Sequence, residues 1–187
     1  MIAIFNRIRY VNQYPLVLAG VFLILVSSVL LRLLEQKKPK IHWLCHLLFW
    51  SYIGGAFYFT VFARHINFEA RSLRLTPFVA IQKAISFENG LHISSFDSLY
   101  QVFLNIMLFV PLGFMLPHIL QNENLYQIVL LGFSLSLFIE VLQFVFGIGL
   151  AEMDDLIHNS FGTFVGCYLY IASKKLMQSY RIQDKSK

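Results

Sequence analysis

The sequence predicts an all-α protein: a polytopic bundle of about five transmembrane helices that forms a single integral membrane domain over residues 1–187. Hydrophobic residues make up 57% of the chain and charged residues only 13%, whereas a soluble domain carries about 25% charged residues. The apolar residues also gather in runs of about 20, the length of helix that crosses the hydrocarbon core of a bilayer. A soluble globular enzyme is therefore not expected, and a disordered chain is excluded.

Five apolar runs are the candidates for these helices. The first is uncharged until Arg32, the second and third hold no charge, and the fourth holds only Glu140. The fifth run is short and opens with Asp154 and Asp155. The expected spans cover residues 15–34, 43–63, 99–120, 125–146 and 154–173.

The connection over residues 64–98 is the only long one between the expected spans. Thr76 is a good helix N-cap and Pro77 suits the first helical turn, while Asn89–Gly90 is a typical helix stop. One face of this segment is apolar and carries Phe78, Ile81 and Ile85. The pattern predicts a short helix that either lies in the membrane interface or packs its apolar face on the bundle.

Lysine and arginine counts predict the orientation. With five spans, one side of the membrane carries Arg7, Arg9, Arg64, Arg71, Arg74 and Lys83. The other side carries Arg32, Lys37, Lys38, Lys40, Lys174, Lys175, Arg181, Lys185 and Lys187. Because cytoplasmic loops are enriched in these residues, nine against six places the N-terminus outside and the C-terminus in the cytoplasm.

Glu140 is the most informative residue, because a carboxylate inside a span costs roughly 2.5–3.5 kcal/mol on insertion scales and is functional by default. It shares one helical face with Ser136, Gln143 and Gly147, at intervals of four, three and four residues. The fourth span therefore has a polar edge on an otherwise apolar helix.

The third and fifth spans carry similar polar faces. In the fifth, the same spacing links Asp155, Asn159, Gly162 and Gly166. The two glycines form a small-xxx-small pair, which lets a neighbouring backbone approach closely. The third span contributes Gln101 and Asn105, four residues apart, and its Pro111 and Gly113 are expected to interrupt the helix, as at a loosened backbone near a site.

These faces are expected to meet on one side of the membrane. The Gln121–Asn124 turn joins the third and fourth spans as a hairpin, so Asn105 near the start of one and Glu140 near the end of the other lie at the same depth, roughly 9 Å. The fifth span begins on that side. The sequence predicts one polar pocket, open to a single face and lined by Arg74, Asn105, Glu140, Gln143, Asp154, Asp155 and Asn159.

Other roles stay open for these residues. Amides such as Asn105 and Gln143 often join helices by hydrogen bonds of ~0.6 kcal/mol each, and Asp154 and Asp155 could cap a helix. Two carboxyl groups in different environments can also divide acid and base roles, so Glu140 and Asp155 are the candidate catalytic pair of a hydrolase or transferase. No strong metal-ligand spacing is present, and neither a metal nor another cofactor is expected.

Four stretches, in order along the chain, resemble the successive motifs of the VanZ-like family over about residues 45–172. They are RSLRLTPF (71–78), NIMLFVPLGFMLP (105–117), IEVLQFVFG (139–147) and MDDLIHNSFGTFVG (153–166). By this resemblance the motif positions are Arg74, Asn105, Pro111, Gly113, Glu140, Gln143, Asp154, Asp155, Asn159 and Gly162. The chain departs from the pattern at Arg74, where members often have Asn, and in the Gly147–Glu152 loop, which lacks an arginine that many members carry.

The resemblance implies a multi-pass protein of the bacterial plasma membrane. The family's named member is associated with resistance to teicoplanin, a lipoglycopeptide, so the expected function is recognition of a lipid-linked envelope precursor or an amphipathic molecule at the cell envelope. Arg74 would bind an anionic group there, or pair with Glu140 or an aspartate. The alternatives are an intramembrane acid–base enzyme and a structural or partner-binding protein. The net charge of +5 favours anionic membrane lipids over nucleic acid as partners.

Overall fold

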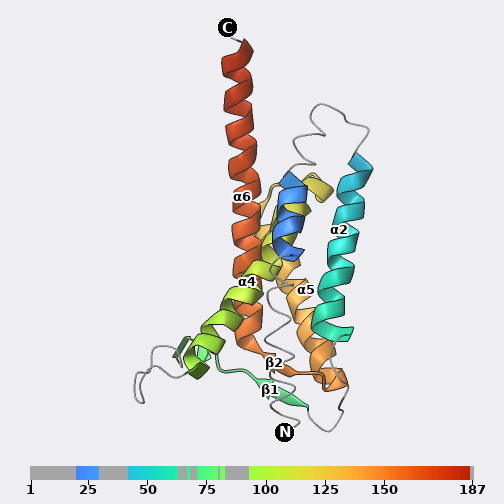
Figure 1. Ribbon diagram of the computed structural model, residues 1–187, viewed down its shortest axis with the longest axis vertical. Coiled ribbons are helices and arrows are strands. Elements are labelled where there is room, and N and C mark those ends of the chain that lie inside the picture. The colour runs from blue at the N-terminus through green and yellow to red at the C-terminus, as the bar shows by residue number, and fades with distance from the viewer. Residues whose placement is uncertain are drawn as a thin grey trace.

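The computed structural model is mostly helical and describes residues 20–29, 42–62, 67, 71–79, 81–82 and 93–185 (Figure 1). Five helices lie in this part of the chain: Gly20–Val29, α2 (His42–Phe57), α4 (Ile93–Leu120), α5 (Leu125–Phe146) and α6 (Met153–Lys185). A π-helix, η2 (Tyr58–Phe62), continues α2. Two short strands, β1 (Ser72–Arg74) and β2 (Leu150–Glu152), are also present, and positions 79 and 81–82 are helical.

Three helical segments within the described residues are long and apolar enough to cross a membrane: Trp43–Val61, Ser98–Leu120 and Leu125–Phe146. They agree with the second, third and fourth expected spans, and the fourth agrees at both ends. Of the first expected span, only the helix Gly20–Val29 lies within the described residues. Helix α6 begins where the fifth span is expected, but it runs for 33 residues, well past residue 173.

Helices α4 and α6 approach each other through glycines. A Cβ atom on Gly162 would lie 2.2 Å from the Ile106 carbonyl oxygen, and one on Gly166 would lie 2.0 Å from that of Val110. Gly113 on α4 has the same relation to Thr163, with a 2.0 Å approach to its carbonyl oxygen. The small-xxx-small interpretation of α6 is therefore confirmed, and its partner is α4.

The expected interruption of the third span is wrong, because α4 continues through Pro111 and Pro117. A proline removes one backbone hydrogen bond of a helix, and in membrane proteins neighbouring helices can satisfy the freed groups. Pro111 leaves the Met107 carbonyl without its helical donor, and one residue further on the Tyr52 hydroxyl of α2 donates to the Leu108 carbonyl, so α2 is bonded to α4 in this turn. Gly113 serves close packing against Thr163.

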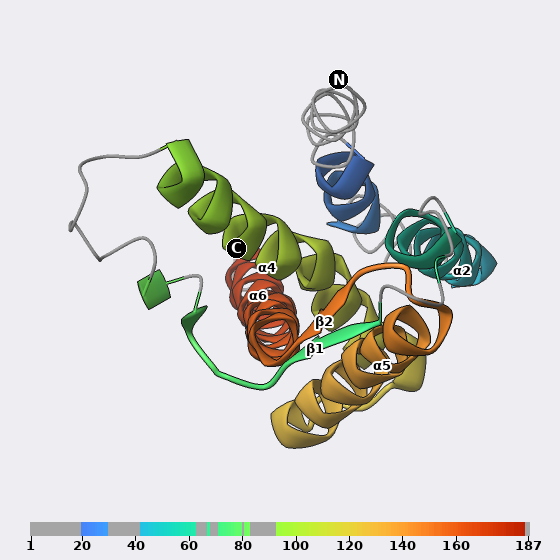
Figure 2. The same cartoon turned by 90° about the horizontal axis from the view of Figure 1, so that it is seen from below.

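The strands form a parallel two-stranded sheet, which the all-α prediction did not include. Ser72 pairs with Leu150, Leu73 with Ala151 and Arg74 with Glu152. The sheet lies at one end of the bundle, where α2 and α5 end and α4 and α6 begin (Figures 1 and 2). We refer to this end as the sheet end.

The helix expected in the long loop is described only at its start. Phe78 has a left-handed φ of 63°, and helical residues follow it at positions 79 and 81–82. The Gln82 N–H donates to the Phe78 carbonyl at 2.8 Å. The helix thus starts after Phe78, two residues later than the Thr76 cap predicts, and its expected end at Asn89–Gly90 lies outside the described residues.

Candidate functional site

Glu140 directs its carboxylate at the sheet. It lies near the end of α5, where its side chain is only 6% exposed, and its Oε2 accepts a hydrogen bond of 2.9 Å from the backbone N–H of Glu152 in β2. A buried carboxylate needs such donors, because burial without a partner is costly. Glu140 therefore ties the end of α5 to the sheet.

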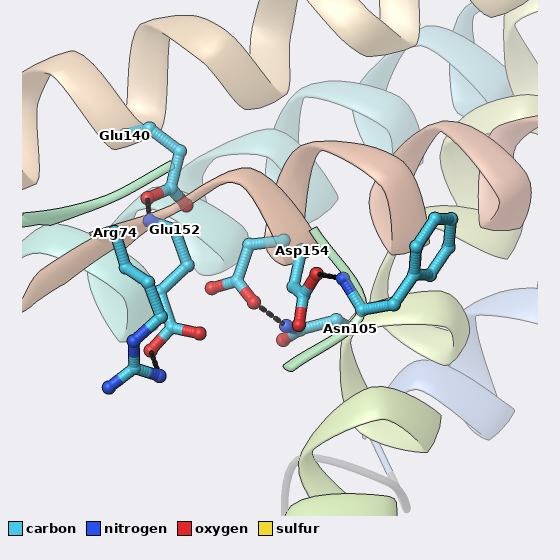
Figure 3. A network of polar contacts seen from close by, with 7 residues as sticks. Arg74, Asn105, Glu140, Glu152 and Asp154 are labelled. Carbon is cyan, nitrogen blue, oxygen red and sulfur yellow. Dashed lines mark hydrogen bonds and ion pairs between the residues drawn. The ribbon is translucent and has the colours of Figure 1, made fainter. Parts of the chain in front are cut away.

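Arg74 forms an ion pair with Glu152 across the sheet. Its Nη1 lies 3.1 Å from Oε1 of Glu152, and the two side chains are 35% and 12% exposed. Figure 3 shows the guanidinium at the outer edge of the polar network. The structure thus pairs Arg74 with Glu152, where the sequence had suggested Glu140 or an aspartate. Sequence reasoning missed Glu152, because only the β1–β2 register places it opposite Arg74.

Asp154 anchors the residues that follow β1. Its side chain is 2% exposed, and its Oδ1 accepts a hydrogen bond from the backbone N–H of Phe78 (Figure 3). Bulky residues rarely adopt the left-handed φ that Phe78 has. The carboxylate supplies an acceptor for that unusual backbone, so Asp154 holds a segment from outside its own helix in addition to lying in the first turn of α6.

Asp155 and Asn105 connect the starts of α6 and α4. The Asn105 Nδ2 donates to Oδ1 of Asp155 at 2.6 Å. This is the contact between the third and fifth spans that their polar faces suggest. It lies beside the Asp154 contact at the same end of the bundle (Figure 3).

Gln143 and Asn159 contact other groups. The Gln143 Nε2 donates to the Thr60 carbonyl of η2 at 3.1 Å, which links α5 to a π-helical turn, a feature often found at functional sites. The Asn159 Nδ2 donates to Oγ of Ser136 at 2.8 Å, deeper in the α5–α6 interface. The Thr163 hydroxyl then donates to the Asn159 carbonyl.

Two buried atoms of α6 lack a hydrogen-bond partner in the described part of the chain: Nε2 of His158 and Oδ1 of Asn159. Most buried polar atoms in proteins are paired. These two unpaired atoms are exceptions, and both lie near the start of α6, close to the sheet end. Over the same residues, no group of three or more His, Cys, Asp or Glu side chains is arranged to hold a metal ion.

The structure therefore gathers Arg74, Glu140, Asp154, Asp155 and Asn105 at the sheet end, together with Glu152. Gln143 and Asn159 bind neighbouring helices instead. Each carboxylate of this group accepts a hydrogen bond or forms an ion pair within the protein. A cavity elsewhere, among Gly20–Val29, α2 and α4, contains none of the predicted site residues; its lining is Ser28, Cys45, Leu48, Phe114, Met115, His118 and Ile119.

Comparison with known proteins places these residues in a wider context. Residues 49–176 match the family model described as VanZ/LLP1. The protein named "Protein VanZ" from Enterococcus faecium is 31% identical over 121 residues, which cover 62% of this chain and 63% of that relative. The chain thus matches less than two thirds of the length of that relative. No solved structure matches.

Proposed function

Because the chain belongs to the VanZ/LLP1 family, we propose that it is a five-span protein of the bacterial plasma membrane that recognises a lipid-linked or amphipathic molecule at the cell envelope. The observation that carries this proposal is the charged network at the sheet end. Arg74 lies at its outer edge, partly exposed, and Glu140 lies buried and accepts a hydrogen bond from β2. Partly exposed arginine is well suited to binding anionic groups.

Charge distribution supports an extracytoplasmic position for the network. Arg74 lies at the sheet end, whereas Lys174 and Lys175 lie near the other end of the bundle, where Lys174 pairs with Glu123 of the α4–α5 turn. The positive-inside rule places the more basic lysine end in the cytoplasm. The C-terminus is then cytoplasmic, and the network faces the envelope.

The bonding of the acids favours recognition over acid–base catalysis. Glu140 accepts the Glu152 N–H, and Asp155 accepts the Asn105 amide. A general acid or base needs to exchange its proton with a substrate at hydrogen-bond distance, whereas both of these carboxylates already accept hydrogen bonds that join elements of the protein. Both residues position the network. The resemblance to the family's named member makes resistance to a teicoplanin-type lipoglycopeptide the function to test.

Glu140→Gln and Asp155→Asn are each expected to abolish teicoplanin resistance in cells that express the protein, without lowering its abundance in the membrane. Each change keeps the shape of the side chain and an oxygen that can accept the hydrogen bond, but it removes the negative charge. The difference between a charged and a neutral hydrogen bond is about 1–1.5 kcal/mol, which is roughly five- to tenfold in affinity. The measurement is the inhibitory concentration of the drug, with abundance determined by immunoblot.

Glu123→Gln is the matched control, because Glu123 is an exposed acid at the opposite end of the bundle. It is expected to retain wild-type resistance. If both site variants also keep resistance at normal abundance, the proposed function is wrong.

A further inference from the structure

The segment Arg71–Phe78 presents a row of exposed apolar side chains. Leu73, Leu75 and Phe78 are 56%, 63% and 46% exposed. Leu73 lies in β1 and Leu75 directly follows the strand, so the two leucines flank Arg74 along the chain. Exposed apolar groups gathered in this way mark an interaction site. In a membrane protein, the ends of the spans lie at the level of the lipid head groups.

Arg74 lies between the two leucines and retains donor capacity. A guanidinium has five N–H donors, and its hydrogen-bond partner among the described residues is Glu152, through Nη1 alone. The side chain is 35% exposed. A phosphate group could therefore approach the guanidinium from outside without breaking a buried bond.

The protein holds this segment in place. The ladder between β1 and β2 fixes the backbone of Arg74 opposite Glu152, Glu140 holds the Glu152 N–H, and Asp154 holds the Phe78 N–H. A recognition element that is ordered before binding loses less conformational entropy when it binds. The buried acids thus prepare a cation flanked by apolar side chains.

We propose that Arg74 binds the phosphate head group of an anionic membrane lipid, with Leu73 and Leu75 in contact with the acyl chains. This inference rests on the proposed recognition function and gives the chemical class of its ligand. Guanidinium groups match phosphate oxygens with two parallel hydrogen bonds. The flanking leucines favour a phosphate attached to a lipid over a free phosphate ion. Glu152 is the anion with which the lipid phosphate competes.

The proposal is tested with purified full-length protein in a neutral detergent, titrated with dioleoyl phosphatidic acid and followed by native mass spectrometry. Arg74→Gln is expected to weaken binding about tenfold or more, and Arg74→Lys, which keeps the charge but loses the planar fork, is expected to weaken it less. Glu152→Gln removes the competing anion and is expected to tighten binding about two- to fivefold.

Two further arms distinguish lipid from ion. Leu75→Ser is expected to weaken phosphatidic acid binding about fivefold or more, and inorganic phosphate is expected not to compete. Lys175→Gln, an exposed residue near the far end of the bundle, is the matched control and should bind as the wild type does. Thermal unfolding of every variant in the same detergent shows whether each variant is folded.

Equal binding by the wild type and a folded Arg74→Gln variant would overturn the inference, as would tighter binding by that variant or full competition by inorganic phosphate. If Arg74→Gln loses lipid binding while Glu140→Gln keeps teicoplanin resistance in cells, the lipid site stands and the proposed function fails. If lipid binding is indifferent to Arg74 while resistance still requires Glu140, the proposed function stands and the inference fails.

Discussion

Replacement of Gly166 by valine is expected to prevent the bundle from folding. A Cβ at this position would lie 2.0 Å from the Val110 carbonyl oxygen and 2.7 Å from the Phe114 nitrogen, both backbone atoms of α4 that no side-chain rotation can move. The helices would have to separate. Overpacking of a well-packed core typically costs about 1–3 kcal/mol, and a clash with backbone belongs at or above the upper end of that range. Thermal unfolding in detergent and the yield of monodisperse protein measure the effect.

Gly54→Ala is the matched control, because a Cβ on Gly54 of α2 would meet no atom within 4 Å. Alanine is the better helix former by about 0.8–1 kcal/mol, so this variant is expected to match or exceed the wild-type unfolding temperature. A Gly166→Val protein that melts with the wild type would show that α4 and α6 do not approach as closely as described here. It would also weaken the case for the Asn105–Asp155 contact, which lies in the same α4–α6 interface about three helical turns nearer the sheet end.

Features that depend on local pattern could be predicted from the sequence. Both ends of α5 follow from an apolar run of bilayer length and from its flanking turn, and Asn124 caps the helix by accepting the Gln127 N–H. The inward direction of Ser136, Glu140 and Gln143 follows from helical periodicity, and all three are buried. These signals lie within one or two turns of chain, so no tertiary information is needed to detect them.

The sheet could not be predicted in the same way. It joins two strands of three residues each, and its ion pair links positions 78 residues apart. Strands this short carry no alternation that distinguishes them from loop. Because the strand register alone places the Glu152 side chain opposite Arg74, no local pattern in the sequence indicates this ion pair. The partner of Arg74 was missed for the same reason, and that of Asn159 was missed because its contact with Ser136 depends on how α5 and α6 pack.

The prolines of α4 lie within a continuous helix, although the sequence of α4 alone predicts a break at Pro111. Pro111 predicts a break when the helix is considered alone, since it removes a backbone donor. In the folded chain Pro111 is fully buried, and the Tyr52 hydroxyl of α2 binds the backbone just before it. The neighbouring helix α2 is thus bonded to α4 in the turn where the proline removes a helical hydrogen bond.

Asp154→Ala is expected to release the segment that carries Arg74. The variant removes a charged acceptor from the Phe78 N–H, a bond of about 1.5–3 kcal/mol, and leaves Phe78 in a left-handed conformation that costs roughly 1–2 kcal/mol for an L residue. Hydrogen exchange of the amides from Leu73 to Phe78 is expected to accelerate by about 10- to 100-fold. Phosphatidic acid binding should weaken as well, although Arg74 itself is unchanged.

Two companion variants separate the acceptor from the strain. Asp154→Asn keeps a carbonyl oxygen for the Phe78 N–H and is expected to show a smaller acceleration. Phe78→Gly in the Asp154→Ala background removes the cost of the positive φ, since glycine adopts it readily, and is expected to restore part of the protection. Unchanged exchange in Asp154→Ala would mean that the β1–β2 ladder alone holds the segment. Acceleration that glycine fails to reduce would mean that the lost hydrogen bond, and not backbone strain, governs how Arg74 is presented to the membrane.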